Sequence, residues 1–399
     1  MSLYLSSRCT GISPSATLEI NTRAKQLRAE GKHVYGFAVG EPDFPTPEYI
    51  CDAAREALKL GLTRYTPVAG TKELRGAICE KLERDNNLHY KPSEVIVSNG
   101  AKQALLNAFV AILNPGDEVL LPTPCWVSYP EMIRMAGGVP IMVKTKEEEG
   151  FLPSLKLLEK LTTPRTKAIV INSPNNPTGC VYPPELLEKI AEFAIEKEIY
   201  VVSDEIYERL IYDGQQHVSI ASFGPQIHKQ AIVINGLSKT FAMTGWRMGY
   251  AAASEDIVNA MAAYQSHATS GANSIAQYAS YKALQNGAAY IRAMREEYDA
   301  RRQLMVAKIN GMDGVSCITP HGAFYVMLNV KKLIGRTFRG EKIEDAVALS
   351  RMLLDAVNVA VVPGDAFEAP GFCRISYAVS REDIDAGLDA IGRFVGMVE

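Results

Sequence analysis

The stretch EVIVSNGAKQALLNAFVAIL, residues 94–113, joins two different patterns across one glycine. The run EVIVS is rich in β-branched residues and is typical of a strand that is buried on both faces. After Gly100, apolar residues recur at helical spacing as far as NPGDE, residues 114–118. A strand that leads directly into a helix is the repeating unit of an α/β fold.

The same alternation continues from about residue 48 to about residue 285. We expect further strands at 118–122, 139–143, 167–174, 199–205, 231–235 and 250–254. Helix-like stretches such as residues 183–198 lie between several of them, which predicts a mostly parallel sheet covered on both faces. The charged stretch 288–310 is predicted to be a connecting helix, and the runs GAFYVML, VAVVPG and CRISYAV after it indicate a smaller α/β domain. The turn-rich segment before residue 48 could lie against either part.

Composition excludes several classes of partner. The 399 residues are 47% hydrophobic and 22% charged, with a net charge of −3, which gives no electrostatic reason to expect nucleic acid or an anionic membrane. The longest apolar stretch, 104–113, is too short to span a bilayer. The N-terminus lacks the apolar core of a secretory signal, although its serine-rich, acid-poor start leaves an organelle-import segment open.

The cysteines and histidines give no sign of a metal site. Seven cysteines are scattered without a C-x-x-C pair, which predicts reduced thiols rather than a disulfide framework or a zinc site. The six histidines fall in no metal-ligand spacing. We therefore expect a cytoplasmic protein without a metal.

Polar residues interrupt the apolar runs at their carboxyl ends. The four clusters are Asn99-Gly100, residues 172–176, Asp204 and Ser238-Lys239. Each cluster alone is explained by turn formation, since turns favour Asn, Asp, Ser, Pro and Gly. Together they would bring an amine, a carboxylate and several amides to the edge where open parallel sheets bind their ligands.

The amine lies in NGLSKTFAMTGWRMGY, residues 235–250, whose two charges are Lys239 and Arg247. A lysine just past a buried strand is partly desolvated and loses its proton readily. Gly100 opens a helix whose free N–H groups favour a phosphate, and Arg247 could add a bidentate contact. Nucleotide-binding glycine motifs and H-E-x-x-H are absent. A phosphorylated aldehyde that carries a ring nitrogen would use all these groups, which points to pyridoxal phosphate.

Six motifs in this chain are similar to those of one family. GLSKTFAMTGWRMG (236–249) resembles the attachment-site signature of class I pyridoxal-phosphate aminotransferases. The others are RYTPVAG (64–70), NPGDEV (114–119), NSPNNPTG (172–179), SDEIYE (203–208) and GAFYV (322–326). The resemblance implies fold type I and a homodimer with shared active sites. It also implies an N-terminal arm (1–13), a large cofactor domain (48–285) and a small domain formed by 14–47 with 286–399.

The resemblance implies three catalytic residues. Lys239 matches the Schiff-base lysine and catalytic base, Asp204 the acid beneath the pyridine nitrogen, and Tyr207 the phenol that donates to the cofactor's ring oxygen. A carboxylate in that place keeps the ring nitrogen protonated. Further cofactor contacts map to Gly100, Ala101, Lys102, Trp126, Asn176, Ser238, Arg247 and, from the neighbouring subunit, Tyr65. Gly236 stands where family members often carry a serine, so one phosphate hydroxyl is missing.

Substrate contacts follow from the same resemblance. Arg374 matches the arginine that clamps the α-carboxylate, together with Gly40, Asn176 and Trp126. The chain is most similar to the prokaryotic-type aspartate aminotransferase subgroup, in which Thr17 and Lys102 would meet a distal carboxylate. Plain structural alternatives stay open for four of these residues: a core Trp126, a solvent-facing Lys102, a surface Arg374 and a turn glycine at position 40.

The implied activity is ping-pong transfer of an amino group between an L-amino acid, aspartate first, and a 2-oxo acid, 2-oxoglutarate first. Prephenate, aromatic or alanine-type substrates remain open. So do a lyase that uses pyridoxal phosphate on the same scaffold and a non-catalytic module that only binds the cofactor.

Overall fold

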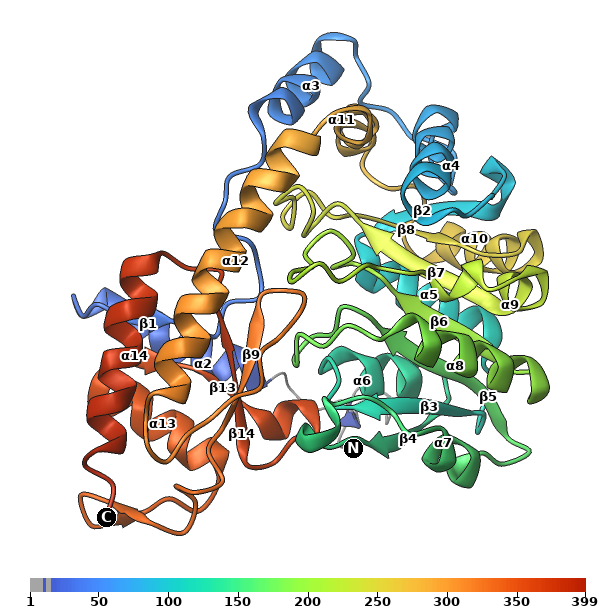
Figure 1. Ribbon diagram of the computed structural model, residues 1–399. Coiled ribbons are helices and arrows are strands. Elements are labelled where there is room, and N and C mark those ends of the chain that lie inside the picture. Colours follow the sequence, from blue (N-terminus) through green and yellow to red (C-terminus); the bar gives the residue numbers. More distant parts are fainter. Residues whose placement is uncertain (1–9, 12–15) are drawn as a thin grey trace, which may run out of the picture.

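The structure is a computed structural model that describes residues 10–11 and 16–399, without the side chains of residues 16–19 and 21. A seven-stranded sheet in the order β2-β8-β7-β6-β5-β3-β4 dominates one side of the molecule (Figure 1). Its strands are β2 (Val95–Asn99), β3 (Glu118–Thr123), β4 (Val139–Lys144), β5 (Thr166–Asn172), β6 (Tyr200–Asp204), β7 (Ala231–Gly236) and β8 (Met248–Ala252). The sheet is mostly parallel, as expected, and β8 alone runs antiparallel to both of its neighbours.

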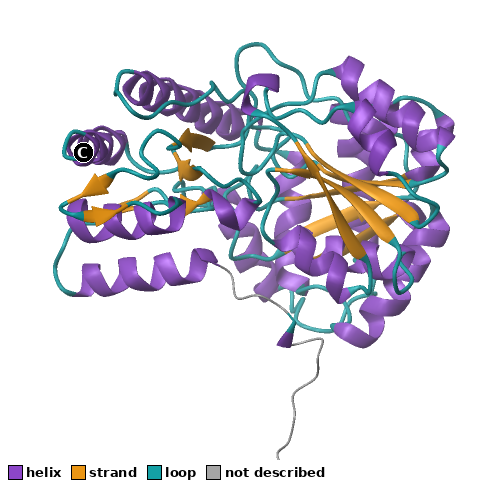
Figure 2. Cartoon of the chain, turned by 90° about the horizontal axis from the view of Figure 1, so that it is seen from below, coloured by secondary structure: helices purple, strands orange, loops and turns teal. Residues whose placement is uncertain are grey.

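Helices cover both faces of this sheet (Figure 2). They are α4 (Lys72–Asn86), α5 (Ala101–Ile112), α6 (Ser128–Met135), α7 (Leu155–Leu161), α8 (Pro184–Glu196), α9 (Pro225–Gln230), α10 (Glu255–Ala268) and α11 (Ser274–Gln285). Helix α3 (Glu48–Lys59) stands away from the sheet and packs on α11 (Figure 1). Successive strand residues therefore enter different cores: Ile232 and Ile234 belong to one hydrophobic cluster and Val233 to another. Burial on both faces explains why these strands read as continuous apolar runs.

A second group of elements lies beside the large sheet (Figure 1). It contains the antiparallel sheet β13-β14-β9, formed by Val362–Pro363, Phe372–Ser376 and Tyr325–Asn329. The helices around it are α2 (Ala16–Ala29), α12 (Ala288–Asn310), α13 (Ala346–Val357) and α14 (Arg381–Val395), and a short hairpin joins β10 (Thr337–Phe338) to β11 (Glu341–Lys342). The connecting helix expected at 288–310 is present with these bounds.

The segment before residue 48 is joined to this second group. Strand β1 (Tyr35–Gly36) pairs in parallel with β12 (Val359–Ala360). Farther along the same segment, Thr46 bonds to Ala242 and Trp246 of the large part, so the segment contacts both parts. The expected N-terminal arm, 1–13, lies outside the described residues except for residues 10 and 11. The domain boundaries themselves stay a prediction.

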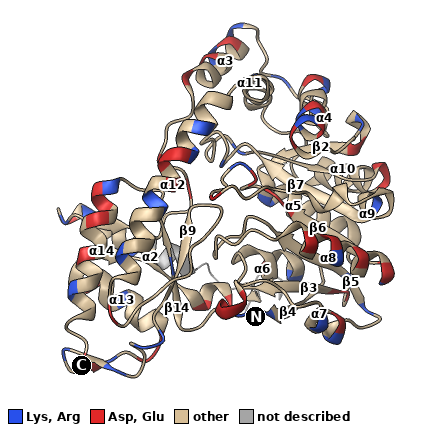
Figure 3. Ribbon diagram, in the orientation of Figure 1, with Lys and Arg blue, Asp and Glu red and all other residues tan. Residues whose placement is uncertain are grey.

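The charged side chains are distributed over the outer helices. Figure 3 shows acidic and basic residues interspersed along α8, α12 and α14, among others. None of the helices in the described part of the chain combines the length and the apolar character that crossing a bilayer requires.

Candidate active site

The carboxyl ends of β3, β5, β6 and β7 lie at one edge of the large sheet, and a cavity of about 830 Å³ opens there. Residues 38–41, Tyr325 and Arg374 of the second group contribute to its wall. Most of the site residues expected from the sequence line it: Gly40, Ala101, Lys102, Trp126, Asn176, Asp204, Tyr207, Ser238, Lys239, Arg247 and Arg374. The fold thus brings together the polar residues that end separate strands.

Lys239 follows β7, and its Nζ donates to the carbonyl oxygen of Gly40 at 2.5 Å. Burial lowers the pKa of this ammonium to about 8, against the opposing effect of the Glu41 carboxylate. The positive charges of Arg374 and Arg247 lower it further. An amine that is partly deprotonated near neutral pH can act as a nucleophile and as a base.

Asp204 is the last residue of β6, and only 3% of its surface is exposed. Burial raises the pKa of its carboxyl to about 6, although hydrogen bonds from the Tyr129 hydroxyl and the Ile206 backbone oppose that rise. Tyr129 donates to Oδ2 at 2.7 Å, and the Ile206 N–H donates to Oδ1 at 3.2 Å. Among the described residues, Asp204 forms no ion pair with a basic side chain. A cationic ligand group would therefore find an acid here that has no fixed counter-ion.

Tyr207 lies three residues after Asp204 and is also buried. Its hydroxyl lies 2.9 Å from the hydroxyl of Tyr325, and its ring meets Phe324 edge-on. Burial, followed by the neighbouring Tyr325, raises the pKa of the Tyr207 phenol well above its ordinary value. The phenol therefore stays protonated and can donate a hydrogen bond.

Arg374 of β14 is 4% exposed, so the surface alternative for this residue is wrong. Its Nη1 donates to Oδ1 of Asn176 at 3.0 Å, and its Nη2 donates to the Ala38 carbonyl at 3.1 Å. The guanidinium also lies 4.4 Å from the ring centre of Tyr325. Its Nε is buried and has no hydrogen-bond partner within the described part of the chain. A planar cation without a carboxylate partner is suited to bind an anionic ligand.

The start of α5 forms a cationic cradle with Arg247. Gly100 caps this helix with φ of +82°, and a Cβ at this position would lie 2.4 Å from Nη2 of Arg247. Similarly, a Cβ on Gly249 would lie 2.1 Å from the backbone nitrogen of Ala101. Glycine at both positions thus lets the guanidinium approach free N–H groups at a helix N-terminus, an arrangement that favours a phosphate. Ser238 adds a hydroxyl to the same cavity.

Lys102 and Trp126 form the rim of the cavity. The Nζ of Lys102 lies 4.8 Å from the centre of the Trp126 ring. Partial burial, and then the charge of Arg247, lower the pKa of Lys102. Trp126 is half-buried and lines the cavity, so it is not simply a core residue.

Two of the expected residues, Gly100 and Tyr65, do not line the cavity, and a third cannot be placed. Gly100 lies beneath Arg247, and Tyr65 is 98% exposed. Thr17 lies in α2, but its side chain is outside the described residues. Within one chain, therefore, the structure does not bring Tyr65 to the other residues.

Two tyrosines of the site were not identified from the sequence. Tyr129 bonds to Asp204, and Tyr325 lies between Tyr207 and Arg374. Tyr325 belongs to the GAFYV motif, which was a usable signal. Tyr129 follows Trp126 by three residues, a helical spacing that places both on one face only if a helix starts there.

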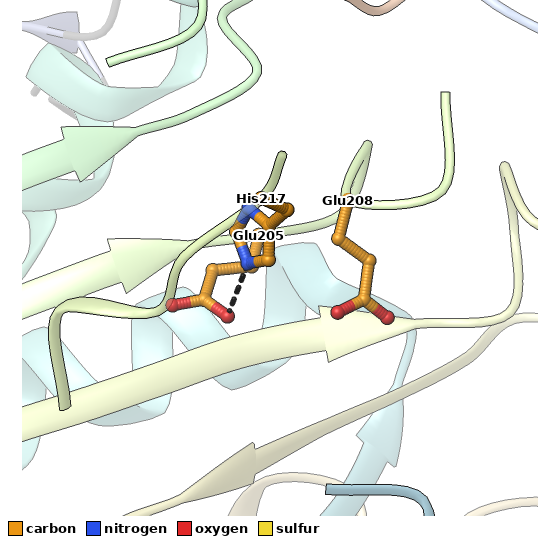
Figure 4. Close-up of side chains that lie close together, drawn as sticks. All are labelled: Glu205, Glu208 and His217. Atoms are coloured by element: carbon orange, nitrogen blue, oxygen red, sulfur yellow. Dashed lines mark hydrogen bonds and ion pairs between the residues drawn. The ribbon is translucent and has the colours of Figure 1, made fainter. Parts of the chain in front are cut away.

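Two buried acids and a partly buried histidine form an ionic cluster after β6 (Figure 4). Its members Glu205, Glu208 and His217 have polar atoms within 4.8 Å of one another. His217 contacts Glu205 at 3.0 Å, and Glu208 forms an ion pair with Lys81. Because Lys81 already pairs with Glu208, and His217 with Glu205, we interpret the cluster as an ion-pair network rather than a metal centre.

Comparison with known proteins gives a consistent picture. The family described as aminotransferase class I and II matches residues 32–391. A probable aspartate/prephenate aminotransferase of Aquifex aeolicus is 46% identical over 389 residues, which is 97% of each chain. An aspartate aminotransferase of Bacillus subtilis is 45% identical over 393 residues, covering 98% of this chain and 99% of that protein.

The solved structures that are similar to this chain include aspartate aminotransferases as well. The aspartate aminotransferase of Thermus thermophilus, solved with maleate, aligns with a TM-score of 0.93 and 44% identity. The alignment covers 98% of this chain and all of that one. The aspartate aminotransferase of Rhizobium meliloti aligns over the full length of both chains, with a TM-score of 0.96 and 38% identity.

Proposed function

This chain belongs to the class I and II aminotransferase family, and from that premise we propose that it transfers an amino group between L-aspartate and a 2-oxo acid, with 2-oxoglutarate as the first candidate. The observation that carries the proposal is the meeting of Lys239, Asp204 and Arg374 in one cavity. The names of the relatives support aspartate as the substrate.

We propose pyridoxal 5'-phosphate as the cofactor, because the residues present fit it. The cradle formed by Gly100 and Arg247 suits the phosphate, and the amine of Lys239 suits the aldehyde. Asp204, which has no ion-pair partner among the described residues, suits a protonated ring nitrogen. When bound, this cofactor supplies an aldehyde that captures amines and a ring that accepts electrons from the substrate's α-carbon.

Each of the chain's own site residues would then have a separate role. Lys239 would take the proton from the substrate's α-carbon and carry it away from that carbon, and Asp204 would balance the positive charge of the ring nitrogen. Tyr207 and Asn176 would donate hydrogen bonds to the ring oxygen, and Trp126 would stack on the ring. Each role suits the chemistry of the side chain and its place beside the cavity.

The phosphate contacts would involve a separate set of residues, at the start of α5 and in the segment after β7. Ala101 and Lys102 offer backbone N–H groups at the start of α5, while Ser238 and Arg247 offer side-chain donors. Tyr65 would add its hydroxyl from the neighbouring subunit of a homodimer. Its 98% exposure in a single chain leaves it available for that contact.

Substrate recognition would use two cationic groups. Arg374 clamps the α-carboxylate, with Asn176 and the backbone of Gly40 completing that site. Lys102 and Thr17 meet the distal carboxylate of aspartate. The dicarboxylate maleate in the Thermus structure is the kind of ligand that such a pair of sites accepts.

A cytoplasmic location is also part of the proposal. Six cysteines of the described residues are free thiols, at positions 51, 79, 125, 180, 317 and 373. Reduced thiols are typical of the cytosol.

The function is tested with the full-length chain, pyridoxal 5'-phosphate and borohydride. We expect visible absorbance, a reduced adduct on Lys239, and amino transfer from aspartate to 2-oxoglutarate. The Lys239→Ala variant should lose the adduct and nearly all turnover, whereas Lys229→Ala, a helix-surface lysine of α9, should keep both. An adduct at another lysine, or full turnover by Lys239→Ala, contradicts the proposal.

A second candidate is prephenate as the amino acceptor. It is favoured by the relatives named aspartate/prephenate aminotransferase from Aquifex and Thermus. Rates with prephenate and with 2-oxoglutarate, measured with the same amino donor, decide between the two acceptors.

A further inference from the structure

Tyr129 connects two walls of the cavity. It lies on α6, three residues after Trp126, and is 1% exposed. Its ring meets the Trp126 ring edge-on at 5.4 Å, and its hydroxyl donates to Oδ2 of Asp204 at 2.7 Å. One buried side chain therefore contacts both the proposed stacking residue and the proposed acid.

The Asp204 carboxylate is held at both of its oxygens. Tyr129 occupies Oδ2, and the Ile206 N–H occupies Oδ1. The ionisable groups around it are Tyr129 on α6, Lys239 after β7, and Glu205 and Tyr207 on its own segment.

The Tyr129 phenol acts as a permanent donor in this arrangement. Burial, reinforced by the charge of Asp204, raises the pKa of Tyr129 well above its ordinary value. Within the described part of the chain, Tyr129 provides the side-chain hydrogen bond to this carboxylate. Hydrogen bonds to a charged acceptor are roughly twice as strong as neutral ones, so the contact favours the ionised acid.

We propose that Tyr129 is a positioning residue that orients the Asp204 carboxylate and keeps it ionised for a cationic ring nitrogen. The inference rests on the proposed function, because that nitrogen belongs to the proposed cofactor. Without Tyr129, the carboxylate would keep only the backbone contact to Ile206 and would more readily take up a proton.

The test is Tyr129→Phe, which removes one oxygen and keeps the ring beside Trp126. Binding of pyridoxal 5'-phosphate should weaken about tenfold at neutral pH. The acid midpoint of binding, followed by visible absorbance, should move up by about one pH unit. In the chain without cofactor, the loss of melting temperature should be larger at about pH 7.5 than at about pH 5, because Asp204 is ionised only at the higher pH.

Tyr90→Phe is the matched control. The Tyr90 hydroxyl is also buried, but it has no hydrogen-bond partner among the described residues. Its removal should leave cofactor affinity and the pH dependence of melting unchanged.

The Asp204→Asn variant shows whether the effect of Tyr129 depends on a charged acceptor, because an amide carries no charge. In that background Tyr129→Phe should lower the melting temperature equally at both pH values. If Tyr129→Phe alone does not fold, folding of the double variant supports the inference and misfolding of the double variant overturns it.

The outcomes separate the two proposals. A wild-type chain that binds pyridoxal 5'-phosphate, with the same acid midpoint in Tyr129→Phe, overturns the role of Tyr129 and leaves the function intact. A wild-type chain that binds no cofactor overturns the function, while the pH dependence of melting still decides whether Tyr129 stabilises the ionised Asp204.

Discussion

Two acids on one short segment, Asp204 and Glu208, lie in opposite environments although both are buried. For Glu208, burial alone would raise the pKa, but the charge of Lys81 and then that of His217 bring it down to about 2. For Asp204, the direct donors are a phenol and a backbone N–H, and its pKa rises to about 6. Burial therefore does not decide whether an acid is structural or available for a ligand. The presence of a fixed counter-ion does.

The network around Glu208 is self-contained. Lys81 pairs with it, and the Asn86 amide donates to its second oxygen at 2.8 Å. Neither Glu208 nor Lys81 lines the cavity that Asp204 and Tyr207 share. In the segment 204–208, Asp204 thus faces the cavity, whereas Glu208 holds the segment in place through its ion pair with Lys81.

Removing the counter-ion should give the largest change. In Lys81→Met, Glu208 would be left buried without its cation, so we expect the free energy of unfolding to fall by about 3–5 kcal/mol. Urea denaturation measures this loss. The double variant Lys81→Met/Glu208→Gln should recover most of it, and a single variant as stable as the wild type would break the comparison.

Replacing the acid at the cavity should affect catalysis instead. We expect Asp204→Asn to lower kcat/KM for aspartate by about 10²–10³-fold, or about 3–4 kcal/mol, because a preorganised charge is lost. The free energy of unfolding should not fall, since the variant no longer buries an unpaired charge. Steady-state kinetics and urea denaturation of the same sample check both parts. A destabilised variant with normal kcat/KM would reverse the assignment.

The pH dependence of stability sharpens the contrast. The pKa of Asp204 is raised in the fold from 3.8 to about 6, so its contribution to stability is complete below pH 3.8 and is lost as the pH rises through 6. Relative to the wild type without cofactor, Asp204→Asn should gain up to roughly 2–3 kcal/mol between about pH 4 and pH 7. Thermal unfolding across this range measures the gain, and parallel curves would contradict it.

The smallest of these effects concerns a cation at the rim. Among the described residues Lys102 has no acidic partner, and its ammonium lies over Trp126. We expect Lys102→Ala to raise KM for aspartate by about tenfold, as for the loss of one hydrogen bond to a charged group, and KM for alanine much less. Equal changes in the two KM values would remove Lys102 from the distal site.

The sequence predicted the large sheet because its strands are short apolar runs bounded by turn residues. The runs at 118–122 and 231–235 became β3 and β7 within one residue at their ends. The antiparallel direction of β8 was not predictable, because Met248–Ala252 is as apolar as its parallel neighbours. Direction depends on the connection through Lys239, which carries no periodic pattern.

Candidate site residues could be predicted from the sequence where they follow strands. Contacts between residues that are distant in sequence could not be predicted. Asp204 and Lys239 interrupt apolar runs and attract attention. Glu208 and Lys81 are far apart in sequence, and each alone looks like an ordinary helix or turn charge. Tyr129 looks like a core aromatic, because its partner on β6 is known only once α6 is placed.

The pairing of β1 with β12 has a consequence for biosynthesis. Tyr35 and Gly36 pair with Val359 and Ala360, and the Ala38 carbonyl accepts a hydrogen bond from Arg374. A nascent chain therefore lacks one wall of this cavity until Arg374, 336 residues after Ala38, has left the ribosome's exit tunnel. A small molecule can be captured between Ala38 and Arg374 only after both of these distant segments have been synthesised and have folded together.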